Sequence, residues 1–235
     1  MVKTLSPCCL APLKRNSKGA SCARCGRAFP LRRGVLDLRF GGRRGALDLV
    51  NALPPVAWVY PLWRERSTHL LTGGRLDHQE ELVQLEGAFS GLSGPFLDVG
   101  TGAGAYLGPL LRMGPTFGVD ASLAFLEVAR RRFPEAVLLL ARAEALPFPT
   151  GAFQGVAFGP TLNELQNPHR GLLEAHRVLH PDGRLFFALA LGRGRKVGLW
   201  LPTEEEAAQA LMGAGFRILW KLSQGRFLLG SAQKP

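Results

Sequence analysis

The 235-residue chain lacks the features that would place it in a membrane or in an oxidising compartment. Its longest apolar runs, such as residues 185–191, are far shorter than the ~20 residues that a membrane-spanning helix needs. No apolar segment follows the charged N-terminal start, as it would in a secretory signal. The four cysteines all fall within the first 25 residues. We therefore expect a cytoplasmic protein with no membrane partner, whose cysteines are metal ligands or free thiols.

Acidic residues are scarce only at the front of the chain. Residues 1–66 carry a net charge of +10, whereas residues 67–235 carry +1. Seven arginines fall within 21 residues: Arg24, Arg27, Arg32, Arg33, Arg39, Arg43 and Arg44. Because the planar guanidinium suits phosphate, this basic front end favours RNA as a partner, bound with a strong salt dependence. The alternative is a solvated surface in a chain that uses few lysines.

Composition divides the chain into three parts. Residues 1–40 contain the cysteines, and residues 41–90 mix helical patches (47–53 and 77–89) with turn signals, so they form a helical linker or lid. Residues 91–235 alternate strands and helices. Strands are predicted at 96–99, 116–119, 136–140, 153–158 and 185–191, helices at 105–113, 123–132, 168–179 and 204–212, and a hairpin at 216–230. This order predicts an α/β domain with a mostly parallel sheet, helices on both faces and an antiparallel C-terminal strand.

A glycine-rich turn follows the first strand of this domain. Its sequence, Asp98-Val99-Gly100-Thr101-Gly102-Ala103-Gly104, lets a ligand approach the main chain closely beside a helix N-terminus. Asp120 ends the next strand, where a carboxylate can accept hydrogen bonds from both ribose hydroxyls. The dinucleotide fingerprint is formally met, but Asp98 would repel a pyrophosphate and attract an ammonium group. The cofactor that fits is S-adenosylmethionine, which carries an ammonium and a sulfonium.

Four segments resemble motifs of the class I S-adenosylmethionine-dependent methyltransferases. They are 98–104, the glycine motif; 118–122, the ribose motif; 143–148, the adenine edge; and 177–185, the turn before the fifth strand. The resemblance covers residues 94–235 and implies a Rossmann-like methyltransferase fold and methyl transfer from S-adenosylmethionine.

The resemblance also implies a set of cofactor-binding residues. These are Asp98, Gly100, Thr101, Gly102 and Gly104 at the methionine end, Asp120 at the ribose, and Ala121, Ala143 and Glu144 at the adenine. The chain departs from the pattern at Arg142, where many relatives have an aspartate, and at Gln154 and Asp182. No catalytic residue is assigned, because positioning alone can drive displacement at an activated methyl. Asn163, Glu164 and His169 are the polar residues expected nearest the substrate.

The cysteines form two unequal pairs. Cys22 and Cys25 make a knuckle of the kind that grips zinc, whereas Cys8 and Cys9 are adjacent. The segment 6–13 resembles the first knuckle of small zinc ribbons, with Cys9 at the second ligand position, Ser6 in place of the first, and Cys8 able to replace it by bending the turn. We expect a zinc-ribbon-like module with zinc on Cys8, Cys9, Cys22 and Cys25; the alternative is a degenerate ribbon without metal.

The whole layout resembles two kinds of enzyme. A ribbon, a helical stretch and a methyltransferase domain occur in bacterial ribosomal RNA guanine methyltransferases, and ribbons are also fused to small-molecule methyltransferases of quinone biosynthesis. The sequence favours methylation of a ribosomal RNA base; the alternatives are a small-molecule methyltransferase or a noncatalytic cofactor-binding protein. Trp58, Tyr60 and Trp63 are expected to pack in the core or in a lid, with Tyr60 also able to close over the methionine end.

Overall fold

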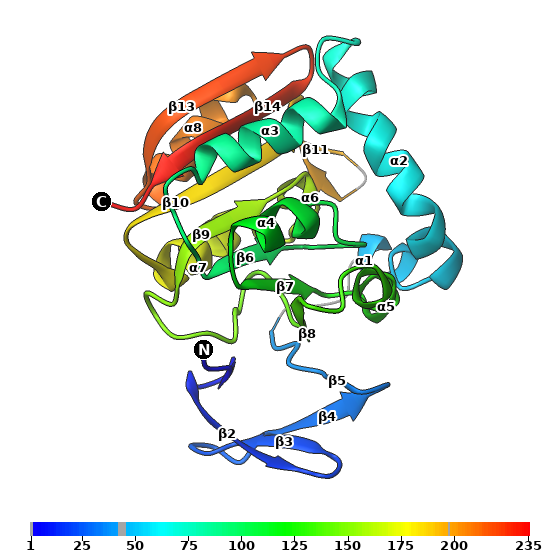
Figure 1. The fold of residues 1–235 in the computed structure, drawn as a ribbon, viewed down its shortest axis with the longest axis vertical. Coiled ribbons are helices and arrows are strands. Elements are labelled where there is room, and N and C mark those ends of the chain that lie inside the picture. Colours follow the sequence, from blue (N-terminus) through cyan, green and yellow to red (C-terminus); the bar gives the residue numbers. More distant parts are fainter. Residues whose placement is uncertain (1, 42–45, 197) are drawn as a thin grey trace.

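A seven-stranded sheet forms the centre of the computed structural model, which describes residues 2–41, 46–196 and 198–235 (Figure 1). The strand order is β13-β14-β10-β9-β6-β7-β8. Five strands are parallel: β6 (Phe96–Val99), β7 (Thr116–Asp120), β8 (Val137–Leu140), β9 (Phe153–Phe158) and β10 (Leu179–Ala190). The C-terminal hairpin of β13 (Arg217–Gln224) and β14 (Phe227–Gln233) adds antiparallel pairs. The predicted α/β architecture is confirmed.

Helices cover both faces of this sheet (Figure 1). On one face α3 (His78–Ala88) and α4 (Leu107–Met113) share an apolar cluster with Phe186. On the other, α7 (Pro168–Val178) and α8 (Glu204–Gly213) pack in a cluster with Phe187. Neighbouring residues of a strand point to opposite faces, so β10 serves both clusters and is apolar throughout its second half. The remaining helices of this domain are α5 (Leu123–Arg132) and the short α6 (Thr161–Glu164), and β11 (Arg195–Lys196) pairs with β12 (Leu199–Trp200).

Most predicted elements lie within a few residues of their predicted bounds, and the largest shift lies at β10. This strand begins six residues before the predicted 185, because Leu179 still pairs with Phe153 and the turn at 180–183 becomes a bulge within the strand. The capping box of α8 is confirmed: Glu206 N donates to Thr203 Oγ1 at 3.2 Å, and Thr203 N donates to Glu206 Oε2 at 2.8 Å.

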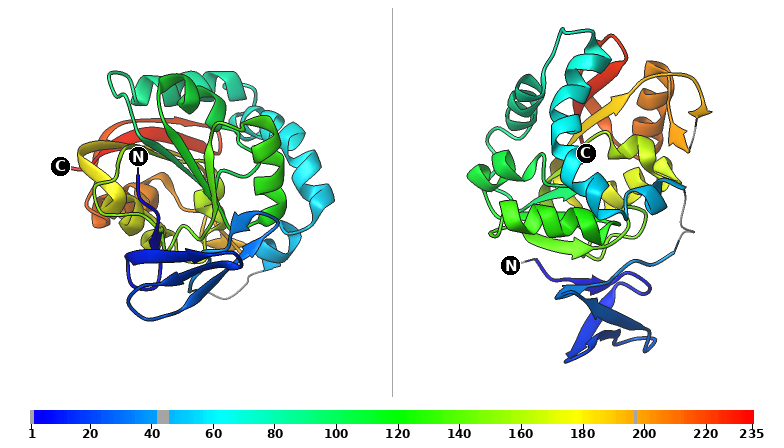
Figure 2. Two further views of the ribbon diagram at one scale, coloured as in Figure 1. Left: turned by 60° about the horizontal axis from the view of Figure 1, so that its bottom comes forward. Right: turned by 90° about the vertical axis from the view of Figure 1, so that its right-hand side faces the viewer.

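The N-terminal module is an antiparallel sheet attached to the edge of the large one. Its strands are β1 (Leu5–Ser6), β2 (Ala11–Asn16), β3 (Gly19–Cys22), β4 (Ala28–Arg32) and β5 (Val35–Leu36). Just beyond β5, Asp37 bridges Leu140 in parallel, and Leu38 N donates to Leu140 O at 2.8 Å. The module therefore continues the sheet beyond its edge strand β8, below the main domain in Figure 1 and in both views of Figure 2.

Several arginines of the basic front end hold the module in place. Arg32 Nε and Arg39 Nη2 each lie 2.7 Å from Asp37 Oδ2, and Arg33 Nη1 lies 3.0 Å from Glu127 Oε1 of α5. Arg39 Nη1 also donates to Ala121 O at 3.1 Å. Arg43 and Arg44 lie outside the described residues. Part of the charge that suggested RNA binding is thus used inside the molecule.

A long helix, α2 (Pro54–Thr72), occupies the segment where the sequence predicted turns. Pro54 and Pro55 begin this helix instead of breaking the chain, because the first helical positions need no backbone N–H partner. The shorter α1 (Ala46–Val50) precedes it and ends before the predicted residue 53. Residues 46–90 are therefore mostly helical, with one dominant helix.

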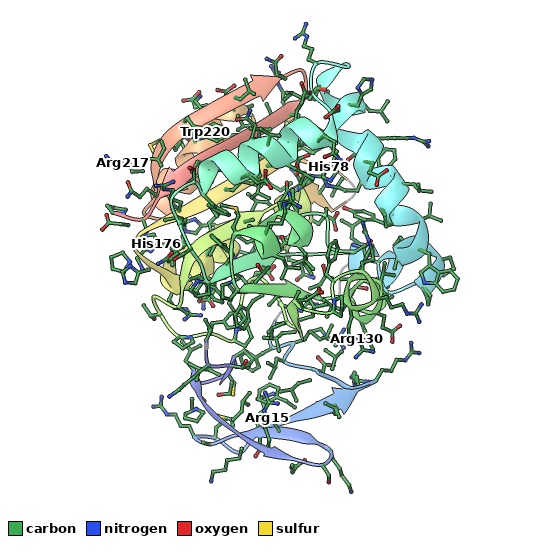
Figure 3. All side chains as sticks on the ribbon, viewed as in Figure 1. Arg15, His78, Arg130, His176, Arg217 and Trp220 are labelled. Atoms are coloured by element: carbon green, nitrogen blue, oxygen red, sulfur yellow. The ribbon has the colours of Figure 1, made fainter. Side chains whose placement is uncertain are left out.

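A buried ion pair fastens α2 to α3. The Glu81 carboxylate is fully buried and accepts hydrogen bonds from Arg64 Nη2, from the Tyr106 hydroxyl and, at 2.6 Å, from Thr68 Oγ1. His78 Nδ1 lies 3.3 Å from Glu81 Oε2, where α3 meets α2 (Figure 3). Burial opposes ionisation of Glu81, but Arg64 and these donors outweigh it and hold its pKa at about 2. The pair is therefore ionised at neutral pH.

Replacing Glu81 tests how much the lid depends on this pair. Glu81→Gln leaves the Arg64 guanidinium buried without a counter-charge, and we expect the free energy of unfolding to fall by about 3–5 kcal/mol. The matched control is Glu86→Gln on the same helix, whose partner Arg112 is mostly exposed; it should cost less than about 1 kcal/mol. Urea denaturation measures both, and equal losses would contradict a special role for Glu81.

Candidate functional site

A cleft opens where β6, β7 and β8 end at the same edge of the sheet. It encloses about 790 Å³ including its open mouth, within the ~300–1,000 Å³ range of ligand pockets. The glycine turn lines it on the side of the sheet. Leu47 of α1, Asn51 of the segment after α1 and Tyr60 of α2 also line it. Among the predicted cofactor residues, those that line it are Gly100, Gly102, Asp120, Ala121, Ala143 and Glu144. The fold thus brings together residues 44 positions apart.

The turn after β6 requires glycine at its first position. Gly100 has φ of 70°, in the left-handed region, and a Cβ there would lie 2.1 Å from Thr161 Cγ2. Gly102 also has a positive φ, 53°, and presents its main chain to the cleft. Gly104 lies behind the turn, where a Cβ would meet the Phe133 ring at 2.7 Å. Its place in the structure is against α5, outside the residues that line the cleft.

Asp120, on the expected ribose side of the cleft, links the glycine turn to the start of α5. Its Oδ2 accepts a hydrogen bond from Gly102 N at 2.8 Å, and its Oδ1 accepts one from Ser122 N at 2.7 Å. A carboxylate can accept up to about four hydrogen bonds, and Asp120 lines the cleft. This fixed, charged acceptor at the end of β7 fits a ribose.

A narrower pocket of about 300 Å³ continues over the glycine turn. Asp98 lines it, is 2% exposed and accepts a hydrogen bond from Thr101 Oγ1 at 2.6 Å. Burial raises the pKa of Asp98 to about 7, and the nearby Asp120 charge adds to this shift. Arg64 from α2 lines the same pocket. One end of the cleft therefore holds a carboxyl and a guanidinium, which match the ammonium and carboxylate of an amino acid.

The sequence did not identify Arg64 as a site residue. It appeared as one more cation of the basic front end, since the helix that carries it was not predicted. Its only local signal is helical spacing from Tyr60, four residues earlier and also in the cleft.

The adenine side is formed by residues that follow β8. Arg142 is 9% exposed and lines the cleft beside Ala143 and Glu144. Glu144 is tied to the next element, since its Oε1 accepts a hydrogen bond from Asn167 N at 3.4 Å. With arginine at position 142, a carboxylate acceptor for an adenine amino group is offered here by Glu144.

The polar residues after β9 divide into three roles. Asn163 is buried and connects α6 to the end of β10: its Nδ2 donates to Ala190 O at 2.9 Å, and its Oδ1 accepts from Ala190 N at 2.7 Å. Glu164 lines the cleft and accepts from Asn51 Nδ2 at 2.9 Å. His169 is exposed and is not among the residues that line the cleft. Of the three, Glu164 alone faces the site.

The four cysteines meet in the N-terminal module. The sulfur atoms of Cys8, Cys9, Cys22 and Cys25 all lie within 4.8 Å of one another, with Cys8 and Cys25 at 3.5 Å. Four thiolates around one zinc at ~2.3 Å stand about 3.8 Å apart, so this cluster fits a tetrahedral ion. Ser6, which replaces the first ligand of the ribbon pattern, is buried and donates its hydroxyl to Cys22 Sγ at 3.2 Å.

Comparison with known proteins agrees with this geometry. Residues 97–187 match the family model described as "Methyltransferase domain". The chain is 31% identical over 121 residues to a demethylmenaquinone methyltransferase of Chlorobaculum tepidum, covering 49% of this chain and 50% of that protein. It is 40% identical over 77 residues to the enzyme of that name from Symbiobacterium thermophilum, covering 30% and 31%. The chain spans half or less of the length of these curated relatives.

Solved structures extend the likeness over most of the chain. An S-adenosylmethionine-dependent methyltransferase from Thermotoga maritima aligns with a TM-score of 0.62 at 20% identity, covering 77% of this chain and 98% of that one. One from Aquifex aeolicus aligns at 0.60 and 22%, covering 78% and 99%. The chain has the Rossmann-like methyltransferase fold. The cyclase SpnF shares that fold (TM-score 0.63, 20% identity, covering 84% and 99%), so the fold does not by itself fix the reaction.

The raised pKa of Asp98 predicts that binding of a ligand with an ammonium group in the narrow pocket depends on pH. An ammonium group binds the ionised carboxylate, which below pH 7 must first lose its proton. Affinity for S-adenosylhomocysteine should therefore rise with pH, by up to about tenfold per unit below 7, and level off above it. In Asp98→Asn the affinity should fall about 10–100-fold at pH 8 and its pH dependence should flatten.

Isothermal titration from pH 5.5 to 8.5 measures this dependence. Asp182→Asn, an exposed aspartate outside the residues of the cleft, is the matched control and should keep the wild-type profile. An unchanged slope in Asp98→Asn would assign the pH dependence to another group.

Proposed function

We propose that the protein transfers a methyl group from S-adenosylmethionine to a small apolar acceptor. The observation that carries this proposal is the cleft, with a ribose acceptor at Asp120, together with the adjoining narrow pocket, which shares Gly100 and Gly102 with it and is lined by Asp98 and Arg64. These charges suit the two ends of the cofactor, and the match to a methyltransferase domain supports the reaction.

The residues of the cleft would orient the reactants. When bound, S-adenosylmethionine supplies a methyl group on a sulfonium, an activated electrophile. Asp120 would hold the ribose, while Asp98 and Arg64 would fix the amino-acid end and so aim the methyl group. The bound cofactor would supply the methyl group: a bond would form from the acceptor's nucleophilic atom to the methyl carbon, the carbon–sulfur bond would break with its electron pair left on sulfur, and the proton of the acceptor atom would pass to water. Holding the nucleophile, the methyl carbon and the sulfur in line can lower the activation barrier by roughly 7–11 kcal/mol, so a catalytic acid or base is not essential.

The enclosure of the site favours a small acceptor, because the acceptor must reach the methyl group beside the narrow end. Tyr60, Tyr106 and Pro160 surround it, and α1 and α2 cover the cleft. The printed names of the curated relatives, demethylmenaquinone methyltransferases, support an apolar aromatic molecule of the quinol class. They do not support the ribosomal RNA base that the sequence favoured, and three arginines of the front end are already engaged in ion pairs within the protein.

Label transfer separates the acceptors. Purified full-length protein is incubated with tritiated-methyl S-adenosylmethionine and either a reduced isoprenoid naphthoquinone without its ring methyl or ribosomal RNA. We expect label in the organic extract and none in RNA. Asp120→Ala should lower transfer at least tenfold, because it removes the acceptor of the Gly102 and Ser122 N–H groups.

Two results would contradict the proposal. Label in RNA would assign the enzyme to nucleic acid. Tight binding of S-adenosylhomocysteine with no label in either acceptor would indicate a noncatalytic cofactor-binding protein. Asp182→Asn serves again as the matched surface variant and should transfer at the wild-type rate.

We also propose that the four cysteines hold a structural zinc. Metal binding would fix the turns that precede β2 and β4 of the module. The segment after β5 joins this module to the adenine edge, because Leu38 contacts β8 and Arg39 contacts Ala121. Ser6 would act on the site without binding metal: its hydrogen bond lowers the pKa of Cys22 to about 6, which favours the thiolate that zinc needs.

Elemental analysis of the purified protein tests the zinc proposal. We expect one zinc per chain in the wild type and less than half of that in Cys22→Ser, with a lower melting temperature. Ser6→Ala keeps all four thiols and should keep the metal, which separates ligand loss from disturbance of the turn. Wild-type protein without stoichiometric metal, prepared without chelators, would refute it.

A further inference from the structure

The outer face of α2 is apolar, which is unusual for a helix on the surface of a domain. Helices at a surface normally turn their charged residues outward. Here five large apolar side chains are more than half exposed: Trp58 (67%), Val59 (61%), Leu62 (58%), Trp63 (56%) and Leu70 (62%). We call them the α2 outer face.

These residues form one continuous stripe. At 3.6 residues per turn they share an arc of the helix with Arg66, while Ala57, Arg64 and Thr68 are buried on the opposite side. Exposed Leu49, Val50 and Leu53 carry the apolar surface on from α1. Figure 2 shows α2 along the outside of the domain in its right-hand view.

The opposite side of the same helix forms the cofactor cleft. Tyr60 and Arg64 line the cleft from α2, and Asn51 lines it from the segment after α1. Whatever covers the outer face therefore lies one helix diameter, roughly 10 Å, from the reacting groups.

Charge indicates what covers this face. Glu65 is the one acidic residue of α2, whereas exposed Arg66 lies within the apolar arc and exposed Arg75 lies just beyond the end of the helix. A second copy of the chain would bring two such positive regions together, which is unfavourable, whereas a negatively charged surface would attract them. Exposed tryptophan and leucine beside arginine is the pattern of helices that lie in the interface of a bilayer.

We propose that the α2 outer face binds the surface of an anionic lipid bilayer. The helix lies on the membrane and does not cross it: among the described residues, no helix is long and apolar enough to span a bilayer. The expectation of no membrane partner was based on apolar runs too short to span a bilayer. This proposal departs from it, because a helix can bind a bilayer surface without spanning it. It rests on the proposed function for its purpose, because an apolar acceptor dissolved in the bilayer would reach the cleft beside the same helix.

Vesicle sedimentation tests the proposal with full-length protein and no methyl donor. We expect binding to vesicles of equal phosphatidylglycerol and phosphatidylcholine, at least tenfold weaker binding to phosphatidylcholine alone, and weakening with salt. Trp58→Gln combined with Leu62→Gln should reduce binding at least tenfold. The matched control is Val83→Gln combined with Met212→Gln, which removes similarly exposed apolar groups (62% and 56%) from α3 and α8 and should bind like the wild type.

Tryptophan fluorescence gives a second readout. Vesicles should shift the wild-type emission to shorter wavelength, and this shift should be lost in Trp58→Gln combined with Trp63→Gln, leaving Trp200 and Trp220, the latter on β13 (Figure 3). Both variants should bind S-adenosylhomocysteine like the wild type, because the changed side chains point away from the cleft.

Three outcomes would overturn the proposal. They are no binding of wild-type protein to anionic vesicles, equal loss in the matched control, and a wild-type dimer that the Trp58 and Leu62 changes dissociate without affecting vesicle binding. The last would make this face a contact between two copies. Vesicle binding without methyl transfer would refute the proposed function and leave this proposal standing.

Discussion

The buried pair of Arg64 and Glu81 determines how the lid is placed. Its two charges are shielded from water, so each must be satisfied by the other and by Thr68, His78 and the Tyr106 hydroxyl. These partners lie on α2, on α3 and at the start of α4, so a single network fixes the rotation of α2. That rotation turns Tyr60 and Arg64 toward the glycine turn and leaves Trp58 and Trp63 outside.

The cofactor cleft combines main-chain rigidity with three charges from different elements. Asp120 ties the glycine turn after β6 to the start of α5, because its oxygens accept from Gly102 N and Ser122 N. Asp98 lies buried at the end of β6, and Arg64 reaches the same pocket from the lid. Asp98 from the sheet and Arg64 from the lid therefore place a carboxyl and a guanidinium at the narrow end, which suits a zwitterionic amino-acid group.

The N-terminal module shows that a high net charge need not indicate a polyanionic partner. Arg33 pairs with Glu127 of α5 and Arg39 donates to Ala121 O, which holds the module against the main domain. Arg32 and Arg39 also pair with Asp37 beside β5, within the N-terminal segment itself. The structure also explains how the cysteine cluster forms although Ser6 replaces the first ligand of the ribbon pattern. The adjacent Cys8 and Cys9 both reach the cluster, and Ser6 keeps a contact with Cys22 through its hydroxyl.

The order of strands and helices, the glycine turn and the position of Asp120 follow from the sequence, because local periodicity, capping and turn chemistry decide them within a few residues. The strands 96–99 and 153–158 and the helix 123–132 have their predicted bounds for this reason. Only the tertiary structure decided that Pro54 and Pro55 begin a helix, that Arg64 enters the cleft and that Trp58 and Trp63 face solvent, contrary to the expected core or lid packing. Those outcomes depend on Glu81, Tyr106 and other partners distant in sequence, which no local pattern reveals.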